Sequence, residues 1–191
     1  MGGESQLASV MESYLAAAVH SAGAAGSYPC ILAVEPGQTL LKQGLRWLGC
    51  QLAERDVVGV PAMALASGGR ELLIWTEDGE RRSREEVLLL TCAALLDSGQ
   101  RSLHLPPEAP AAIERLARDR GGTVQRMESG VPTGCQRSLR DGLFAACQIV
   151  RYVQRTGETL SQLFQRLPGC QVRRRVVPLR TSRSAVMGAL S

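Results

Sequence analysis

The sequence has little of what marks a membrane or secreted protein. None of its apolar runs approaches the ~20 residues that cross a bilayer. The N-terminus, MGGESQLASVMESYLAAAV, carries two glutamates and lacks the basic start of a signal peptide. Hydrophobic residues make up 45% and charged residues 21% of the 191, an ordinary globular composition. We therefore expect a cytoplasmic protein without a membrane partner, folded as one domain or two small ones.

A strong excess of positive charge is also absent. The chain has 22 Lys and Arg against 18 Asp and Glu, which gives a net charge of only +4. Lys42 is the only lysine and there is no asparagine, a bias that we attribute to the source genome. The one dense basic run, Arg173–Arg175 in QVRRRVVPL, is more typical of an exposed or edge strand than of a phosphate site. We expect no nucleic-acid partner.

Metal-ligand spacing is missing as well. No two cysteines form a C-x-x-C pair, and His20 and His104 are isolated from them and from each other. Several cysteines lie in apolar runs such as CILAV and LLLTCAALL, where a reduced thiol acts as a small hydrophobe. The sequence therefore predicts neither a zinc site nor a Cys–His nucleophile. The cysteines are Cys30, Cys50, Cys92, Cys135, Cys147 and Cys170.

The usual nucleotide and hydrolase motifs are absent too. The chain has no G-x-G-x-x-G after a strand, no P-loop and no G-x-S-x-G. Its 20 glycines are dispersed through turns and helix ends. The sequence thus assigns no catalytic, cofactor-binding or metal-ligating residue, and no cofactor.

What the chain does have is a regular alternation of strand and helix patterns. Helices are expected over residues 7–19, 39–49, 84–98, 107–120, 139–155 and 159–167. Strands are expected over residues 30–34, 57–65, 71–76, 101–105, 123–127 and 172–179. Ser83 and Glu86 have the spacing of a capping box, and Ala66–Arg70 reads as a hairpin-type connection. This order predicts an α/β layer structure with a mainly parallel or mixed sheet.

One long segment resembles a known family. SLRDGLFAACQIVRYVQRTGETLSQLFQRLPGCQVRRRVVPL resembles the alpha-D-phosphohexomutase superfamily, the phosphomannomutases and phosphoglucomutases. In that family Asp-Gly opens a long helix, a T-G-x-x-L-S-x-L segment follows, and a strand ends near Val-Pro. The matching positions are Asp141-Gly142, Thr156-Gly157, Leu160-Ser161 and Val177-Pro178.

Weaker similarities extend the resemblance over residues 30–191. The stretch ILAVEPGQTLLKQGLRWLGCQLAE is similar to the end of the family's second domain, and LLIWTEDGERRSREEVLLLTCAALL to its third. The resemblance implies an N-terminal helix and a partial second-domain-like strand–helix unit in residues 1–55. It implies a third-domain-like α/β domain, with a mixed sheet and helices on both faces, in residues 56–170. Residues 171–191 would be a linker strand and the start of a truncated fourth domain.

Within residues 56–170 we expect one sheet of about four strands over a common apolar stripe. The residues expected to form that stripe are Leu88, Leu89, Leu95, Ile113, Leu116, Leu143, Ile149 and Val153.

The active loops of the family are not matched. The resemblance places its Mg²⁺ loop, D-G-D-x-D, on Ala66–Arg70, where all three carboxylates are missing and Arg70 adds a positive charge. Its sugar-recognition loop, G-E-x-S-G-H, has no counterpart in ESGVPTGCQRSLR, where Glu128–Gly130 is better explained as a plain turn. The domain with the catalytic serine has no match either. Phosphoryl transfer depends on the positioning and charge stabilisation that these parts supply.

Three hypotheses about function follow. The chain is expected to be a non-catalytic phosphohexomutase-like module, a segment of a larger sugar-phosphate or sugar-nucleotide enzyme. The alternative is a segment of an active phosphomannomutase or phosphoglucomutase whose chemistry is completed by other domains. A third hypothesis is an α/β interaction domain with an accidental resemblance, which the strand order would distinguish.

The N-terminal helix suggests a further contact. Leu7, Val10, Leu15 and Val19 form an apolar stripe with no obvious partner in the chain, and a lone strand–helix unit leaves a strand edge uncovered. We therefore expect self-association, or packing against another domain of the parent protein.

Overall fold

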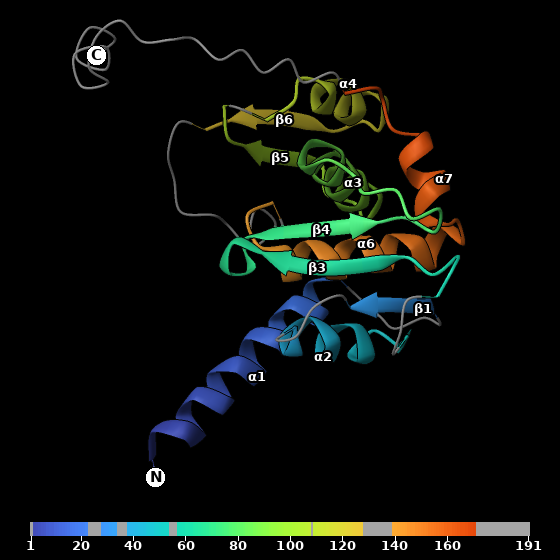
Figure 1. Ribbon diagram of the computed structural model, residues 1–191. Coiled ribbons are helices and arrows are strands. Elements are labelled where there is room, and N and C mark those ends of the chain that lie inside the picture. The colour runs from blue at the N-terminus through green and yellow to red at the C-terminus, as the bar shows by residue number, and fades with distance from the viewer. Residues whose placement is uncertain are drawn as a thin grey trace, which may run out of the picture.

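The computed structural model describes residues 2–22, 28–33, 38–53, 57–107, 109–127 and 139–170 (Figure 1). The helices are α1 (Gly2–Ala22), α2 (Thr39–Trp47), the 3-10 turn η1 (Ser67–Gly69), α3 (Arg84–Asp97), α4 (Ala112–Asp119), α6 (Gly142–Thr156) and α7 (Leu160–Gln165). The strands are β1 (Tyr28–Ala33), β2 (Cys50–Leu52), β3 (Ala62–Ala66), β4 (Glu71–Trp75), β5 (Ser102–Leu105) and β6 (Thr123–Arg126). The predicted α/β class is confirmed.

The strands form two sheets. The larger has the order β2-β1-β3-β4, with β1 parallel to both of its neighbours and β4 antiparallel to β3, so it is mixed. The smaller consists of the parallel pair β5 and β6, which Figure 1 shows beyond the β4 edge of the larger sheet. The prediction of one four-stranded sheet within residues 56–170 is therefore wrong. Two of those strands, β3 and β4, continue the sheet that β1 and β2 begin.

Several element boundaries differ from the sequence prediction for local reasons. Strand β3 begins at Ala62 because Val57–Val60 form a turn in which Gly59 has φ +83°. Helix α4 begins at Ala112, after a tight turn in which Ala111 is already right-handed and the N–H of Ile113 donates to the carbonyl of Pro110. Strand β2 follows directly after the helix end at Gly49. It was not predicted, because three residues are too few to show the alternation of apolar and polar side chains that indicates a strand. The strand expected over 172–179 lies outside the described residues.

The core is organised around α6. This helix contacts α1, α2 and α3 as well as β1, β3 and β4, and 12 of its 15 residues are buried. Of the predicted stripe every residue is buried except Leu88, which is only partly buried because it lines a cleft described below. No helix among the described residues is both long and apolar enough to cross a bilayer.

The N-terminal stripe is partly covered within the chain. Leu15 is buried and Val19 partly buried in the core, where α1 packs on α6 and α2. The expectation that the stripe has no partner in this chain is therefore wrong for these two residues. Val10 is 64% and Met11 38% exposed, on the part of α1 that extends away from the body in Figure 1. The side chain of Leu7 lies outside the described residues.

The start of α6 approaches β4 so closely that only glycine fits. A Cβ atom on Gly142 would lie 2.8 Å from the carbonyl oxygen of Glu71 and 2.8 Å from Cδ2 of Leu65. The first of these neighbours is backbone of β4, which cannot rotate away. The Asp-Gly pair noted in the sequence thus allows the helix to dock against the sheet.

We expect Gly142→Ala to lower the free energy of unfolding by about 1–3 kcal/mol, because the added methyl group must push the helix away from β4. Urea denaturation followed by circular dichroism measures this change. Gly169→Ala is the matched control, because a Cβ atom there meets nothing within 4 Å. Equal stability of the two variants would contradict the close approach.

Candidate functional site

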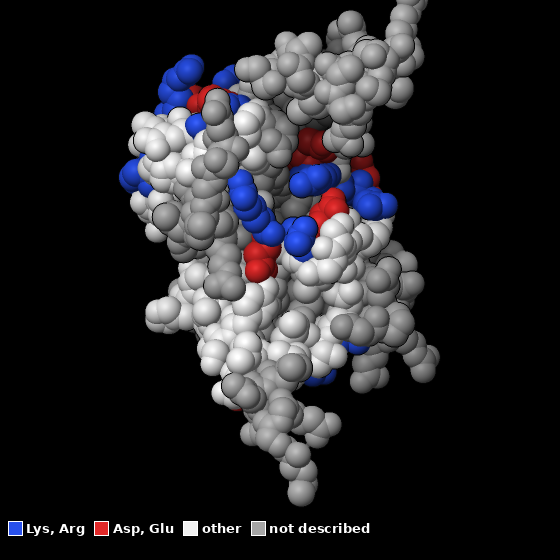
Figure 2. Space-filling view, turned by 90° about the vertical axis from the view of Figure 1, so that its left-hand side faces the viewer, with Lys and Arg blue, Asp and Glu red and all other residues white. Residues whose placement is uncertain are grey.

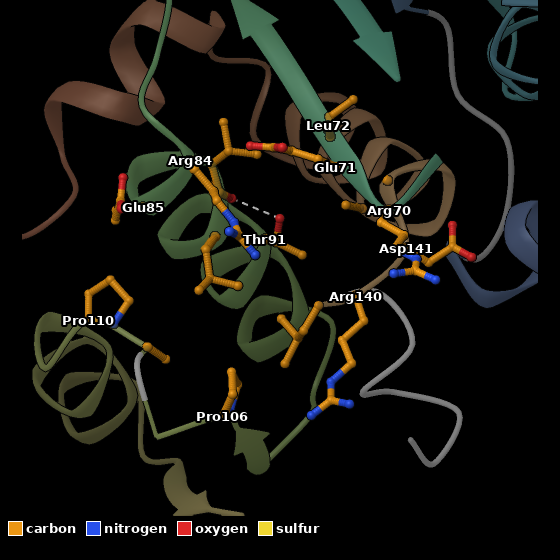
Figure 3. Close-up of a pocket in the computed structure, with 16 residues that line it drawn as sticks. Arg70, Glu71, Leu72, Arg84, Glu85, Thr91, Pro106, Pro110, Arg140 and Asp141 are labelled. Carbon is orange, nitrogen blue, oxygen red and sulfur yellow. Dashed lines mark hydrogen bonds between the residues drawn. The ribbon is translucent and has the colours of Figure 1, made fainter. Parts of the chain in front are cut away.

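A cleft of about 590 Å³ lies where the two sheets and the start of α6 meet. Its walls come from the end of the β3–β4 turn, the first two turns of α3, the segment after β5 and the first residues of α6. Figure 3 shows side chains from all of these elements around the cavity. Apolar residues such as Leu72, Val87 and Leu139 line part of it, so the cleft combines an apolar surface with charged groups.

Three arginines line the cleft from three different elements. Arg70 follows the β3–β4 turn, Arg84 is the first residue of α3, and Arg140 precedes the start of α6 (Figure 3). All three are exposed, and none has a hydrogen bond or ion pair with another described residue. Figure 2 shows a hollow on this face of the molecule with basic and acidic side chains around it. Guanidinium groups remain charged and supply paired donors that fit carboxylates and phosphates.

Other arginines of the chain are held by the fold. Arg126 donates to Glu114 and to the carbonyls of Pro107 and Ala109, which fixes the segment before α4. Arg155 pairs with Asp97 at 2.9 Å. The cleft arginines differ from these in having their donors available to a ligand.

Two of the three acidic residues that line the cleft, Asp141 and Glu71, make hydrogen bonds within the fold; the third is Glu85. Oδ1 of Asp141 accepts the backbone N–H groups of Leu143 and Phe144 and so caps α6. Its Oδ2 accepts the hydroxyl of Tyr14 at 2.6 Å, which ties α1 to the same point. Glu71 accepts a hydrogen bond of 3.3 Å from the hydroxyl of Ser67. These carboxylates therefore serve the local structure beside the arginines.

The β3–β4 turn is the tight hairpin connection that the sequence predicts. Ala66 pairs with Glu71 across it, and Ser67, Gly68 and Gly69 all have positive φ, between 53° and 86°. The turn is solvent-exposed at Ser67 and Gly68. Its only side-chain oxygen is the Ser67 hydroxyl, whereas Mg²⁺ needs several hard oxygen ligands. The turn therefore does not fit the cation that the family resemblance implies.

No group of three or more His, Cys, Asp or Glu side chains among the described residues could hold a metal ion. Cys50, Cys92 and Cys147 are buried cysteines. Burial raises the pKa of the Cys147 thiol to about 12, so the neutral form dominates, as expected of a small core hydrophobe. Cys135, Glu128–Gly130 and Arg173–Arg175 lie outside the described residues, as does the side chain of Cys30.

Sequence reasoning found only one of the three cleft arginines. Arg70 is visible in the sequence because it falls on the family's metal loop. Nothing in the sequence marks Arg84 and Arg140 as binding residues, because arginines are common on protein surfaces at the start of a helix or before an Asp-Gly pair. Only the docking of α6 and α3 around the hairpin brings these positions to one cavity.

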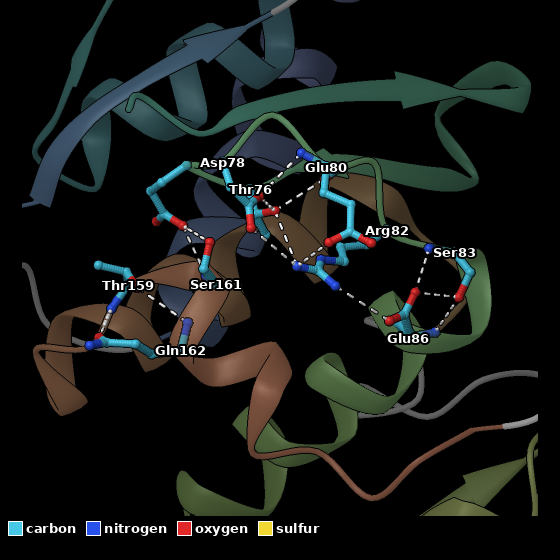
Figure 4. Close-up of polar contacts among 10 residues, drawn as sticks. Thr76, Asp78, Glu80, Arg82, Ser83, Glu86, Thr159, Ser161 and Gln162 are labelled. Carbon is cyan, nitrogen blue, oxygen red and sulfur yellow. Dashed lines mark hydrogen bonds and ion pairs between the residues drawn. The ribbon is translucent and has the colours of Figure 1, made fainter. Parts of the chain in front are cut away.

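A polar network fixes the end of β4 to two helices (Figure 4). The carboxylate of Glu77 accepts the N–H groups of Leu160 and Ser161 and the Ser161 hydroxyl, each at 2.8 Å, and so holds the start of α7. Arg82 pairs with Glu80 at 3.0 Å and lies over the ring of Phe164, 5.2 Å from its centroid.

The predicted capping box completes this network. Ser83 Oγ accepts the N–H of Glu86, whose side chain accepts the N–H of Ser83. Ser83 and Glu86 therefore bind each other at the start of α3, as Asp141 binds the amides at the start of α6. The guanidinium groups of Arg70, Arg84 and Arg140 are the main hydrogen-bond donors that remain for a ligand in the cleft.

Comparison with solved structures identifies the architecture. A phosphoglucomutase/phosphomannomutase family protein from Burkholderia thailandensis superposes with a TM-score of 0.62 at 15% identity, over 84% of this chain and 47% of that one. A Thermus thermophilus protein described as a phosphomannomutase gives 0.62 at 14% identity, over 83% and 50%. The chain has a phosphohexomutase-like fold.

A more distant structure agrees. N-acetylphosphoglucosamine mutase from Aspergillus fumigatus superposes with a TM-score of 0.54 at 9% identity, over 81% of this chain and 48% of that one. The chain thus spans about half the length of these proteins, and identities this low concern the fold alone. No family model and no curated protein matches the sequence. The fold that the sequence resemblance implies is confirmed.

We expect Glu77→Ala to lower the free energy of unfolding by about 1–3 kcal/mol, because the amides at the start of α7 lose their acceptor. Thermal or urea unfolding measures the change. Glu12→Ala, at an exposed position of α1, is the control and should match the unsubstituted protein. Equal stability of the two variants would show that the Glu77 contacts contribute nothing.

Proposed function

We propose that this chain is a non-catalytic phosphohexomutase-like module, a segment of a larger sugar-phosphate or sugar-nucleotide enzyme, which binds a phosphate-bearing ligand in its arginine-lined cleft. The observation that carries the proposal is the combination of three arginines unpaired within the described part of the chain with a turn that lacks metal ligands. The arginines provide affinity for an anion. Without the metal loop, the cleft lacks the group that would stabilise charge during phosphoryl transfer.

The domain organisation and location form part of this proposal. Residues 1–55 would correspond to the end of the family's second domain, 56–170 to its third, and 171–191 to the entry into its fourth. The continuous sheet through β1 and β3 supports treating the first two parts as one folding unit. A role in the cytoplasm agrees with the sugar-phosphate ligand proposed here.

The alternative is a segment of an active mutase that other domains complete. One observation favours it: the chain matches only about half the length of the mutases that share its fold. Against it stands Arg70, whose charge occupies the turn on which the family's cation would sit. The shared fold speaks against the third hypothesis, an α/β domain of unrelated architecture.

Titration calorimetry with glucose 1-phosphate distinguishes the first two hypotheses. We expect the module to bind it without converting it to glucose 6-phosphate, because an anion site remains but the groups for transfer do not. Arg84→Gln should weaken binding by roughly tenfold, since a hydrogen bond to a charged group is lost. Arg118→Gln, on the exposed side of α4, should leave it unchanged. Magnesium-dependent conversion by this chain would instead support an active mutase.

We also propose that the projecting part of α1 contacts a second copy of the chain or another domain of the parent protein. Val10 and Met11 are adjacent exposed apolar residues of this helix, and contiguous exposed apolar surface is typical of interaction sites. Burial of both side chains would remove apolar surface from water.

Sedimentation velocity at micromolar concentration tests self-association. We expect a dimer, and we expect Val10→Glu to shift it to monomer because a carboxylate cannot be buried there at low cost. Ser9→Glu adds the same charge at a neighbouring exposed position and should leave the dimer intact. A monomer whose α1 resists proteolysis would show that this helix closes on its own domain.

A further inference from the structure

We infer that the cleft binds its ligand without a divalent cation, with the Arg70 guanidinium supplying the positive charge beside the β3–β4 turn. The inference rests on the proposed function, since it specifies how the phosphate-bearing ligand is held. It departs from what the family resemblance implies, which is a Mg²⁺ ion bound at this turn.

The conformation of the turn makes this assignment specific. Ser67, Gly68 and Gly69 are all left-handed, and the backbone returns to a right-handed conformation at Arg70, with φ −77°. Ala66 and Glu71 pair across the hairpin, which fixes both ends of the turn. The side chain of Arg70 therefore leaves a constrained backbone and lines the cleft (Figure 3).

The charge on the turn itself disfavours a cation, because Arg70 stands where the family resemblance places a metal-ligating carboxylate. Arg70 would face a divalent ion in the cleft with like charge, and Arg84 and Arg140 add two further positive groups. Three carboxylates also line the cleft, those of Glu71, Glu85 and Asp141. Asp141 accepts hydrogen bonds from α6 and Tyr14, and Glu71 accepts one from Ser67. Mg²⁺ loses water reluctantly and needs ordered oxygen ligands, which this arrangement does not offer.

The same arrangement suits an anion. A phosphate monoester carries nearly two negative charges and several acceptor oxygens, and a guanidinium group can donate to two of them at once. Arg70 and Arg140 lie on the side of the cleft formed by the hairpin and the start of α6, whereas Arg84 reaches in from α3 (Figure 3). An anion between them neutralises charges that the described part of the fold leaves unpaired.

Calorimetry with glucose 1-phosphate tests the inference in two buffers, one with EDTA and one with excess MgCl₂. We expect the same dissociation constant within about twofold in both, since binding needs no metal. Arg70→Gln should weaken binding by roughly tenfold in EDTA. Arg118→Gln is the matched control and should bind as the unsubstituted protein does. Arg70 is exposed and has no side-chain hydrogen bond or ion pair to lose among the described residues, and circular dichroism verifies that the variant is folded.

The outcomes separate this inference from the proposed function. Binding in MgCl₂ but not in EDTA would overturn the inference and leave the ligand-binding cleft standing. Binding in EDTA that Arg70→Gln does not weaken would overturn the role of Arg70 alone. Absence of binding in both buffers would overturn the proposed function together with the inference.

Discussion

The nearly complete burial of α6 is the constraint on which the rest of the structure depends. A helix buried on nearly all sides must approach its neighbours closely, and burial of its polar groups costs free energy wherever they lack a partner. Gly142 permits the approach to β4, and Asp141 satisfies the first amides. Gln148 donates to the carbonyl of Ser21 at the end of α1. Gln154 donates to the carbonyl of Leu48 after α2 and accepts from the buried Arg151. The helix thus binds the N-terminal elements to the rest of the fold.

The cleft also results from the burial of α6. Docking α6 through its N-terminus brings Arg140 and Asp141 to the hairpin that carries Arg70, and α3 crosses close by with Arg84. The fold does not depend on these arginine side chains, because they make no hydrogen bond or ion pair with other described residues. The scaffold and the charge of the cleft can therefore change independently. The hairpin has no carboxylate within Ala66–Arg70, and the chain nevertheless superposes on a phosphoglucomutase/phosphomannomutase family protein at 15% identity.

The sequence predicted the features that depend on neighbouring residues. The Ser83–Glu86 capping box, the hairpin at Ala66–Arg70 and the long helix after Asp141-Gly142 are all present, because their physics lies within a few residues. Features that depend on distant contacts were missed. Periodicity gives strand positions but not partners, so the division into two sheets was not foreseen, nor was the pairing of β3 with β1. The position of Arg84 and Arg140 beside Arg70 in one cleft also depends on distant contacts and was not predicted.

The place of β1 in the larger sheet has a consequence for how the chain can be divided. This strand lies between β2 and β3, so the sheet takes its middle from residues 28–33 and one of its edges from residues 71–75. A fragment that starts after residue 56 would leave the inner edge of β3 unpaired, with its apolar side chains Met63 and Leu65 beside open backbone donors and acceptors. Such an edge is a template for pairing with other chains. Expression of the C-terminal part by itself would therefore favour aggregates, and the division at residue 55 does not separate two independently folding units.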